Sequence, residues 1–590
     1  MRRLDWRLGS LALGMLALAC GGDDAGPTGE VSPDGEMEEA APGGKADAVY
    51  GACQVREAVA WVNDVDVSYE TMRAAGVHTV AARNIIAHRN GLDGVVGTED
   101  DDYFDDAEEL DGVYFVGQVA FRQLTEAVTH RCERAPEAEV IFSPQMYGDS
   151  HLARVAELID QAERSIDIAM YSFSDSGIQD ALERAVGRGV SVRFVFETAN
   201  AEHAKPSGTK SAKLEDLGID VRYVNKIMHH KFVLIDGPRS ELDHAYTATL
   251  VTGSGNWSHS AGTKYDENTV VMRYNGELAL RFQKEFNHLW DNSRDFVWNE
   301  GLTYLQSKPI TDWVIADEPS IDAFFTSANF EVKMSSTYGP TFSVVSGRSE
   351  VSNRLVKLID EAKESIHIAS GHLRSRPVGE ALLAKYAAHP EMDIRILLDG
   401  QEYISSWYND QQQTNLSDCL ASAGDSVSKQ QSCVDKGFYY SYPLQAAGVP
   451  LRFKYYCYRW DYHYAEQMHN KYSIFDGHRV ATGSYNLSDN AEHNTMENVV
   501  LYAGGPYGEL ADQFEGNFGK LWDLAVEDGK YEALVDLIEN TEEDIPLVFD
   551  SMSLTWQQVT DLKELIRQYC PAIDSDAYRK EPYKHTVCPR

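Results

Sequence analysis

A histidine and a lysine occur together twice in the chain, each time as His-x-Lys with an aspartate five residues after the lysine. The first copy lies in Met228–Asp236 and the second in Met468–Asp476. One copy alone would be weak evidence, because three fixed residues can match by chance in a long chain. Two copies therefore call for a comparison of the residues around them.

The residues that follow each motif also match. A Gly-Ser-x-Asn segment comes first and a Glu-Asn pair comes next. The serine, asparagine and glutamate of these segments are Ser254, Asn256 and Glu267 in the first copy, and Ser484, Asn486 and Glu497 in the second. Agreement in residue type and order indicates that a whole unit has been duplicated.

Residues of these types suit the chemistry of a phosphodiester. On a strand, residues two apart project from one face, so His229 and Lys231 point together while Asp236 faces the other way. Two imidazoles, two ammonium groups and two amides provide a nucleophile, a proton donor and partners for phosphate oxygens. His230 lies between two motif positions and faces away from them, so we interpret it as structural.

The duplicated motifs and the segments after them resemble the phospholipase D superfamily over roughly residues 140–525. The resemblance implies that one histidine attacks phosphorus to form a phosphohistidine, while the other protonates the leaving alcohol and then activates water or another alcohol. In two-repeat members the first histidine is generally the nucleophile, which makes His229 the attacking residue and His469 the general acid.

The resemblance also assigns roles to the remaining motif residues. The implied catalytic set is His229, Lys231, Asp236, His469, Lys471 and Asp476. Within it the two aspartates are expected mainly to support the motif. The residues expected to bind the substrate phosphate are Asn256, Asn486, Ser254 and Ser484, and those expected to orient and charge the imidazoles are Glu267 and Glu497. No Cys-x2-Cys or His-Glu-x2-His spacing occurs, so we expect neither a metal nor a cofactor.

Alternating helices and strands must position these residues, and they too occur twice. Residues 158–169 and 358–369 share eight of twelve residues, and in each an amphipathic helix leads into a strand. The sequence therefore predicts an α/β fold with two duplicated phospholipase D-type α/β/α sandwich repeats, at 138–300 and 320–525, after a small all-helical domain. We expect a monomer in which both repeats form one active site.

The beginning of the chain has the features of an export signal. Residues 1–20 contain a basic start, a short apolar run and Cys20, and the run is too short to span a bilayer. The stretch before Cys20 resembles a bacterial lipoprotein cleavage site, although Ala17 stands where leucine is most common; an ordinary signal peptide is the alternative. A linker rich in Gly, Pro and acids is expected over 21–48. We expect a secreted protein or an outer-membrane or cell-surface lipoprotein of a bacterium.

Residues 49–134 form a separate helical unit that resembles a pair of helix-hairpin-helix elements, with hairpins at 75–78 and 115–118. Such elements often bind nucleic-acid phosphates, but the acidic flank at 99–106 would repel DNA. We favour the alternative of a small packing or protein-contact domain. Asp93 with Asp100–Asp102 is a candidate cation site, or else a solvated loop.

The second repeat contains a long insertion between Asp399 and His469 that is crowded with aromatic residues. It is expected either to form a rim over the pocket that contacts lipid, or to bury its aromatics in a core of its own. In an oxidising compartment we expect the pairs Cys53–Cys132, Cys419–Cys433 and Cys570–Cys588, with Cys457 left over. The tail at 526–590 is predicted to be helical, for example over 556–569.

Composition bears on the substrate. Aspartate and glutamate total 92 against 53 lysines and arginines, and the net charge of −39 gives no attractive long-range field for polyanions. The leading hypothesis is therefore a secreted or surface-anchored phosphodiesterase that hydrolyses or transfers phosphatidyl groups of a phospholipid or membrane surface. A metal-independent nuclease of the same superfamily is the second hypothesis, favoured by the helix-hairpin-helix resemblance and opposed by the charge. A catalytically idle surface-binding protein is the third, and the intact motifs oppose it.

Overall fold

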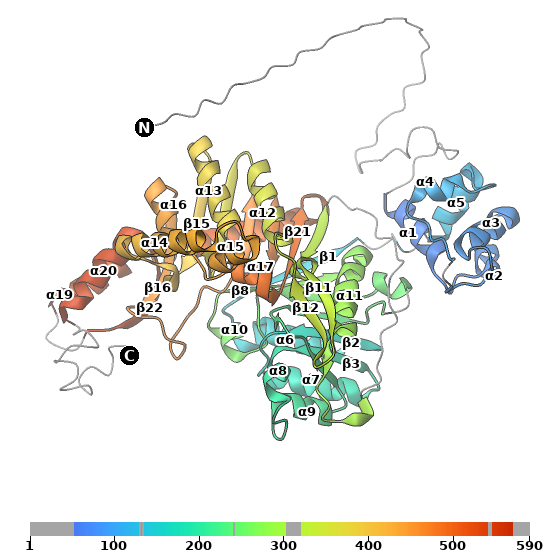
Figure 1. The fold of residues 1–590 in the computed structure, drawn as a ribbon, viewed down its shortest axis with the longest axis horizontal. Helices are drawn as coiled ribbons and strands as arrows, with labels where there is room; N and C mark the ends of the chain where they lie inside the picture. The colour runs from blue at the N-terminus through green and yellow to red at the C-terminus, as the bar shows by residue number, and fades with distance from the viewer. Residues whose placement is uncertain are drawn as a thin grey trace, which may run out of the picture.

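The computed structural model describes residues 52–98, 100–128, 131, 135–239, 242–302, 320–540 and 545–569. Figure 1 shows a small helical domain beside a larger body that contains the β-sheets. The predicted signal peptide and linker lie outside the described residues, as do the side chains of the expected pairs Cys53–Cys132 and Cys570–Cys588. None of the helices in the described part of the chain has the length and hydropathy of a membrane span.

Five helices form the N-terminal domain around buried apolar side chains such as Trp61, Met72 and Phe104. The helices are α1 (Ala52–Asn63), α2 (Tyr69–Ala74), α3 (Thr79–Arg89), α4 (Ala107–Gly112) and α5 (Gln118–Val128). Turns join α2 to α3 and α4 to α5 at the two expected hairpins, and Gly76 in the first has a left-handed φ of 93°. The helix pairs are present, and their identification as helix-hairpin-helix elements stays a prediction.

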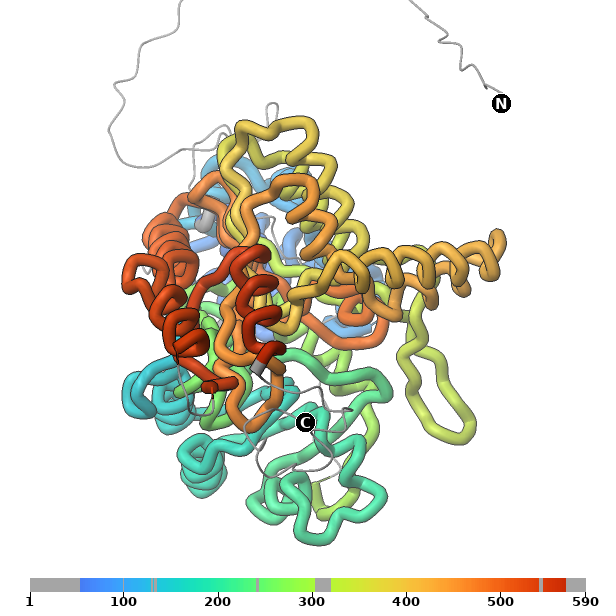
Figure 2. Tube along the Cα trace, turned by 90° about the vertical axis from the view of Figure 1, so that its left-hand side faces the viewer, coloured from blue at the N-terminus to red at the C-terminus, as the bar shows by residue number. Residues whose placement is uncertain are grey.

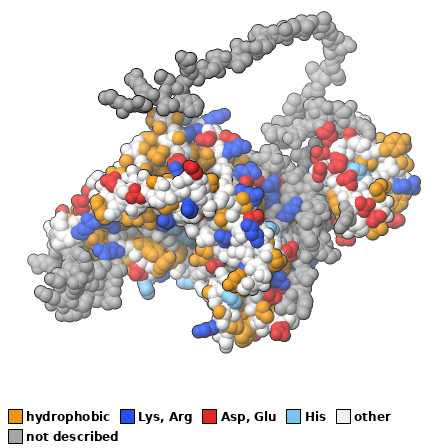
Figure 3. All heavy atoms as spheres, viewed as in Figure 1, with side chains coloured by type: hydrophobic (Ala, Val, Ile, Leu, Met, Phe, Trp, Pro, Cys, Tyr) orange, Lys and Arg blue, Asp and Glu red, His pale blue; other side chains and the backbone are white. Residues whose placement is uncertain are grey.

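The acidic loop between α3 and α4 is held by its own carboxylates. Asp100 accepts hydrogen bonds from the N–H groups of Leu92 and Asp93 (2.6 and 3.1 Å), and Asp93 accepts one from Val95 (2.7 Å). The structure thus favours the solvated-loop interpretation of these residues. Acidic side chains are prominent on the face of this domain in Figure 3.

The first repeat is built on a mixed eight-stranded sheet in the order β1-β8-β7-β6-β2-β3-β4-β9. Its strands are β1 (Glu137–Ser143), β2 (Ser165–Met170), β3 (Ser191–Phe196), β4 (Asp220–Tyr223), β6 (Lys231–Ile235), β7 (Thr249–Gly253), β8 (Glu267–Arg273) and β9 (Arg294–Asp295). Its helices are α6 (His151–Asp160), α7 (Ser176–Gly187), α8 (Glu197–Glu202), α9 (Lys210–Asp216), α10 (His259–Thr263) and α11 (Gly276–Asp291). The apolar face of α6 packs on the sheet with a period of three to four residues, as predicted for an amphipathic helix.

The second repeat has the same plan, with a sheet in the order β10-β21-β18-β17-β13-β15-β16-β22. Its strands are β10 (Ile321–Phe325), β13 (Ser365–Ser370), β15 (Asp393–Asp399), β16 (Leu451–Cys457), β17 (Lys471–Phe475), β18 (Arg479–Gly483), β21 (Asn498–Ala503) and β22 (Val548–Thr555). Its helices are α12 (Glu350–Glu361), α13 (Arg376–Ala388), α14 (Ser406–Ala423), α15 (Val427–Val434), α16 (Ser441–Ala447), α17 (Asp489–Asn494) and α18 (Gly508–Trp522). The predicted fold class, a duplicated α/β fold after a helical domain, is confirmed.

One hydrophobic core joins the two repeats. It contains α11 and α18 together with the facing sides of both sheets, so Phe282 and Phe286 of the first repeat and Phe514 and Phe518 of the second belong to the same cluster. The outer faces of the sheets are covered by separate clusters, one per repeat. Because the repeats share a core, their motifs are held in one rigid body.

The aromatic insertion of the second repeat includes α14, α15 and α16. Its disulfide Cys419–Cys433 joins α14 to α15, which confirms that predicted pair, and the two helices project from the body in Figure 2. Most of the aromatics are buried in the core of the repeat or beside Cys457, which is buried and free. Those that are exposed are Trp407, Tyr408 and Tyr462. The insertion therefore mainly extends the core and leaves only a few aromatics for a rim.

The C-terminal tail is only partly helical. The helices α19 (Lys530–Asn540) and α20 (Trp556–Tyr569) agree with the prediction, but β22 between them adds a strand to the edge of the second sheet, antiparallel to β16. In this strand Met552 and Leu554 pack into the core, and Ser553 between them is also buried. Covering the open edge of β16 with an apolar strand explains why this stretch is not helical.

Candidate active site between the two repeats

Short strand pairs bring the motifs together across the boundary between the repeats. β5 (Ile227–Met228) ends directly before His229 and pairs in parallel with β20 (Thr495–Met496), which ends directly before Glu497. The His229 N–H donates to the Met496 carbonyl at 3.1 Å. The first motif is therefore aligned with the glutamate segment of the second repeat.

The same arrangement occurs on the other side of the boundary. Met468 forms a parallel bridge with Asp266, and the His469 N–H donates to the Asp266 carbonyl at 3.0 Å. Glu267 follows directly. The second motif is therefore aligned with the glutamate segment of the first repeat.

Each motif histidine is bonded to the glutamate of the opposite repeat. His229 Nδ1 lies 2.8 Å from Glu497 Oε1 and 2.9 Å from Oε2, and His469 Nδ1 lies 2.7 Å from Glu267 Oε1. Both glutamates are fully buried, whereas the imidazoles keep 10% and 14% of their side-chain surface exposed. An Nδ1–H that donates to a carboxylate leaves Nε2 as the nitrogen available to a substrate. Neither repeat holds a complete site by itself.

Both motif lysines lie beside the histidines. Lys231 Nζ donates to the His229 carbonyl at 2.7 Å, and Lys471 Nζ donates to the His469 carbonyl at 2.8 Å. Each lysine is nearly buried, so two ammonium groups share a pocket from which most water is excluded. Such a pocket favours a bound anion.

Burial shifts the pKa values of these groups toward their neutral forms. It lowers the pKa of both motif histidines well below the ordinary 6.5, and the lysine charges lower it further. It also lowers the pKa of Lys231 to about 7 and of Lys471 to about 8, and raises those of Glu267 and Glu497 to about 7. Groups with pKa values near neutrality are those that general acid–base catalysis requires.

The two asparagines of the site have hydrogen-bonding capacity in reserve. Asn256 and Asn486 follow β7 and β18 and are half-buried. Within the described residues, the side-chain oxygen of each is buried without a hydrogen-bond partner. These oxygens accept hydrogen bonds, so a donor such as water or a substrate hydroxyl can satisfy them, whereas a phosphate oxygen would bind the amide N–H groups.

Comparison with known proteins agrees with this geometry. The family model "Cardiolipin synthase, PLD-like domain" matches residues 155–290 and 355–522, which are more than half of the chain and include both motifs. The chain belongs to the phospholipase D-like family. Mitochondrial cardiolipin hydrolase of Drosophila melanogaster is 29% identical over 163 residues, 26% of this chain and 62% of the fly protein. The human protein of that name is 29% identical over 189 residues, 31% of this chain and 67% of its own length.

Two solved structures are also similar. Nuc from Salmonella typhimurium, described as a phospholipase D family member, is 30% identical and matches 27% of this chain and 98% of its own, with a TM-score of 0.23. Phosphatidylserine synthase of Haemophilus influenzae is 13% identical and matches 76% of this chain and 94% of its own, with a TM-score of 0.39.

Two serines predicted to bind phosphate directly follow β7 and β18 in this phospholipase D-like fold. Ser254 and Ser484 are fully buried, and their hydroxyls accept hydrogen bonds from the backbone N–H groups of Asn268 (2.9 Å) and Asn498 (3.0 Å). The proximity of each hydroxyl to the glutamate of its own repeat opposes the rise of that glutamate's pKa. The structure thus places both serines at the strands that carry the site glutamates, and their assignment as phosphate ligands stays a prediction.

The two motif aspartates lie at the far end of the motif strands. The carboxylate of Asp236 accepts hydrogen bonds from the backbone N–H groups of Glu163, Arg164 and Ser165, between 2.6 and 3.2 Å. Asp476 makes the equivalent contacts at the start of β13. They anchor the neighbouring strand, as expected of supporting residues, and the structure does not place them in the catalytic pocket.

His230 is fully buried between the repeats. Its Nδ1 accepts a hydrogen bond from Asn498 Nδ2 at 2.9 Å, and its Nε2 lies 3.2 Å from Glu285 Oε1. Asn470 takes the equivalent position in the second motif and accepts from Asn268 Nδ2 at 3.0 Å. These contacts agree with a structural role for His230, which is to join the two repeats.

Two tyrosines at the pocket were not predicted. The Tyr171 ring lies 4.6 Å from the His229 ring, and the Tyr265 ring lies 6.4 Å from the His469 ring. Tyr171 directly follows β2, at the carboxyl end of the strand beside the motif strand, and Tyr265 comes two residues before a site glutamate. The matching positions of the other repeat are Gly371 and Thr495, so the duplication gives no signal for either tyrosine.

A third histidine near the pocket was also missed. The charge of His372 contributes to lowering the pKa of His469, after burial and the two lysines. Its Nδ1 lies 3.0 Å from the buried carboxylate of Glu402, which also pairs with Arg374. The first repeat has a serine at this position, so the two halves of the pocket differ here.

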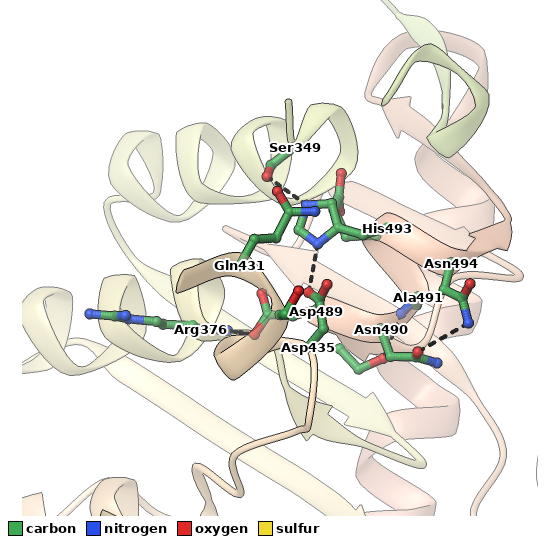
Figure 4. A network of polar contacts seen from close by, with 12 residues as sticks. Ser349, Arg376, Gln431, Asp435, Asp489, Asn490, Ala491, His493 and Asn494 are labelled. Atoms are coloured by element: carbon green, nitrogen blue, oxygen red, sulfur yellow. Dashed lines mark hydrogen bonds and ion pairs between the residues drawn. The ribbon is translucent and has the colours of Figure 1, made fainter. Parts of the chain in front are cut away.

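A polar network holds α17, the helix that leads into Glu497. Figure 4 shows His493 of this helix between Asp435 and Ser349. Its Nδ1 lies 2.8 Å from the Asp435 carboxylate, and its Nε2 lies 3.2 Å from the Ser349 hydroxyl. Asp435 directly follows α15, so the disulfide-linked insertion is fastened close to a glutamate of the active site.

Proposed function

We propose that this protein is a phospholipase D-type phosphodiesterase that hydrolyses or transfers phosphatidyl groups through a phosphohistidine intermediate. The observation that carries the proposal is the crossed pair of contacts, His229 with Glu497 and His469 with Glu267, around two buried lysines. Two imidazoles held by their Nδ1 atoms in one pocket suit attack on phosphorus by one Nε2 and protonation of the leaving group by the other.

The reaction proceeds in two steps. His229 Nε2 attacks phosphorus, the bond to the headgroup oxygen breaks, and His469 gives its Nε2 proton to that oxygen, so the headgroup leaves as an alcohol. A water molecule then attacks the phosphohistidine while His469 takes its proton, and phosphatidic acid leaves as the bond to His229 breaks. An alcohol in place of water gives transfer. The assignment of His229 as the nucleophile rests on the resemblance to two-repeat members of the superfamily.

The remaining pocket residues stabilise the charge on phosphate. Lys231 and Lys471 lie beside the two histidines, and the half-buried Asn256 and Asn486 carry amide N–H groups that can donate to phosphate oxygens. In a dry pocket such donors act strongly on the phosphate oxygens as charge develops in the transition state. These residues require no metal in the reaction that we propose.

A phospholipid is the substrate class that the observations favour. Two relatives are named mitochondrial cardiolipin hydrolase, and one structural neighbour is a phosphatidylserine synthase. The net charge of −39 disfavours a polyanion such as DNA, whereas the exposed aromatics Trp407, Tyr408 and Tyr462 suit a lipid surface. A nuclease remains the second candidate only because of the resemblance of the N-terminal helices to a nucleic-acid-binding element.

We further propose that the protein works outside the cytoplasm, secreted or as a bacterial surface lipoprotein, and as a monomer. The signal-like first twenty residues support export. The disulfide between Cys419 and Cys433 supports an oxidising compartment. Both halves of the pocket come from one chain, which supports a monomer.

Incubation with substrates in EDTA tests this function. Purified protein at 25 °C receives mixed phospholipid vesicles in one reaction, and single- and double-stranded DNA in others. We expect phosphatidic acid to form, DNA to survive, and His229→Ala to abolish lipid cleavage. Rapid DNA degradation without a lipid product would replace the proposal with the nuclease, and no product from either would favour the idle binding protein.

A further inference from the structure

Three carboxylates converge at the edge of the first sheet, away from the active site. Glu215 lies near the end of α9, Asp220 begins β4, and Asp295 ends β9. One oxygen of each lies within 4.8 Å of the others. The motif strand β6 is separated from β4 by β2 and β3, so this group does not belong to the catalytic pocket.

Hydrogen bonds fix two of the three carboxylates in place. Glu215 accepts from the N–H groups of Val221 (2.9 Å) and Asn299 (3.2 Å), and Asp295 accepts from the N–H of Val297 (2.8 Å). These donors occupy only part of the acceptor capacity of the oxygens. The carboxylates are therefore ordered with lone pairs still available.

The third carboxylate is incompletely satisfied. Asp220 is 1% exposed; its Oδ1 lies 3.4 Å from Arg222 Nε, and its Oδ2 is buried with no hydrogen-bond partner in the described part of the chain. A buried carboxylate oxygen without a partner is costly and rare. The unpartnered Oδ2 of Asp220 therefore indicates that a bound group supplies the missing partner.

The positive charge nearby is already shared. Among the residues that the structure describes, Arg222 is the cation that contacts the group directly, and its guanidinium also stacks over Trp290 at 4.3 Å. Arg193, on the adjacent strand, is bonded to Asp167 through two hydrogen bonds of 2.8 and 2.6 Å. Burial, together with repulsion from the neighbouring carboxylates, raises the pKa of Glu215 to about 7. Three acids therefore face one another with too little counter-charge.

We propose that Glu215, Asp220 and Asp295 bind one Ca²⁺ ion. All the ligand atoms are oxygens, which favours Ca²⁺ over Zn²⁺, and Ca²⁺ tolerates the irregular geometry of side chains taken from a helix and two strands. Asp295 is only half-buried, so water reaches its side of the site and can complete the six to eight ligands that Ca²⁺ takes. The ion ties α9, β4 and β9 together and closes the edge of the first sheet. Its role is to stabilise this repeat, and it takes no part in the reaction at the active site.

Calcium titration of the full-length protein, freed of metal with EDTA and dialysed, tests the proposal. Wild-type protein should bind one Ca²⁺ per chain by calorimetry, and its Tm should rise by several degrees in millimolar CaCl₂. Asp220→Asn keeps the shape but removes a charge. This variant should have a Tm in EDTA at least as high as the wild type, because the repulsion is relieved, and its Tm should no longer respond to calcium.

A second group of possible ligands provides the matched control. His88, Asp102 and Glu109 of the N-terminal domain also present three ligand atoms close together, but they are more exposed. Glu109→Gln should leave calcium binding unchanged. Calcium binding that survives Asp220→Asn and is lost in Glu109→Gln would overturn the proposal. The absence of a binding heat in the wild type would also overturn it, and would indicate that protons neutralise the buried acids.

Terbium luminescence locates the ion independently of stability. The indole N–H of Trp298 donates to Asp216 at 2.6 Å, next to Glu215, so Trp298 should sensitise Tb³⁺ bound at the site. Trp298→Phe should reduce the sensitised emission at least twofold while calorimetric calcium binding persists. Because Trp290 also lies near the site, through Arg222, full emission from this variant would place the ion elsewhere if the emission also survived Asp220→Asn. The lipid assay in EDTA at 25 °C is a separate readout, so failure of the calcium proposal and failure of the proposed function are distinguishable.

Discussion

Replacing Glu497 by glutamine should impair a histidine that lies 268 residues away in the chain. The Glu497 carboxylate is fully buried and lies 2.8 to 2.9 Å from His229 Nδ1, and it accepts a further hydrogen bond from the Thr495 hydroxyl. A hydrogen bond to a charged group contributes about 1.5–3 kcal/mol, which corresponds to roughly 10- to 150-fold in rate. Because the glutamine oxygen still accepts a hydrogen bond, we expect a loss of about 10- to 100-fold in kcat.

The reaction step that becomes slower distinguishes the two crossed contacts. Glu497→Gln should slow formation of the phosphohistidine, because it acts on the attacking His229. Glu267→Gln should instead lower the fraction of His469 that is protonated and able to donate. A substrate with an activated leaving group should therefore restore most of its rate. Rapid-quench kinetics on a natural phospholipid and on a p-nitrophenyl ester of phosphatidic acid separates the two cases.

A matched variant controls for burial. Glu285 is also a buried glutamate bonded to a motif-region histidine, His230, but it lies outside the pocket. Glu285→Gln should therefore leave kcat within a few-fold of the wild type. The reasoning is refuted if Glu497→Gln forms the intermediate at the wild-type rate, or if the activated substrate restores Glu497→Gln and not Glu267→Gln.

Three further predictions follow from the same geometry. Activity should show a bell-shaped pH profile: burial lowers the pKa of His229, so the nucleophile is protonated only on the acid side, and activity should fall again as Lys231 (pKa about 7) and Lys471 (pKa about 8) lose protons; a steady rise from pH 4 to 9 would contradict this. His229→Ala should form no covalent intermediate, whereas His469→Ala should still be labelled by the activated substrate; acid-labile, base-stable phosphate on His469 in the His229→Ala protein would reverse the roles. Asp236→Asn should lower the free energy of unfolding by about 1–3 kcal/mol through weaker bonds to three backbone N–H groups, with little change in kcat of the folded protein; a normal melting curve with a large loss of kcat would restore Asp236 to the catalytic set.

The sequence predicted the repeats and the motif residues well, because duplication marks both. Matching helices and strands at 158–169 and 358–369 identified the two sandwiches. Because duplication repeats each pattern at two places, a match by chance at both places is rare.

The crossing of the glutamates could not be predicted in this way. Both repeats carry the same His and the same Glu, so the sequence is equally compatible with Glu267 serving His229 or His469. The choice is made by β5 and β20, two-residue strands that have no sequence signal of their own. Contacts between distant segments decide such pairings, and local patterns do not report them.

Other departures have local physical causes. Ser254 and Ser484 stand in a Gly-Ser-x-Asn segment that suggests phosphate ligands, and the structure adds that each directly follows a buried strand and bonds to the next one. The aromatics of the insertion suggested a rim, yet most of them fill the core beneath it. The prediction of helix for the stretch that forms β22 is wrong because the apolar pattern there covers only a few residues between two helices.

Trapping the covalent intermediate tests the central claim most directly, namely that the two repeats build one active site. Wild-type protein is mixed with phospholipid, quenched in alkali within milliseconds, and its peptides are analysed by mass spectrometry. One phosphatidyl group per chain, on the peptide that contains His229, is the result that the structure predicts. Modification of His229 and His469 together in the same chain, at two groups per protein, would show two independent sites and contradict the account.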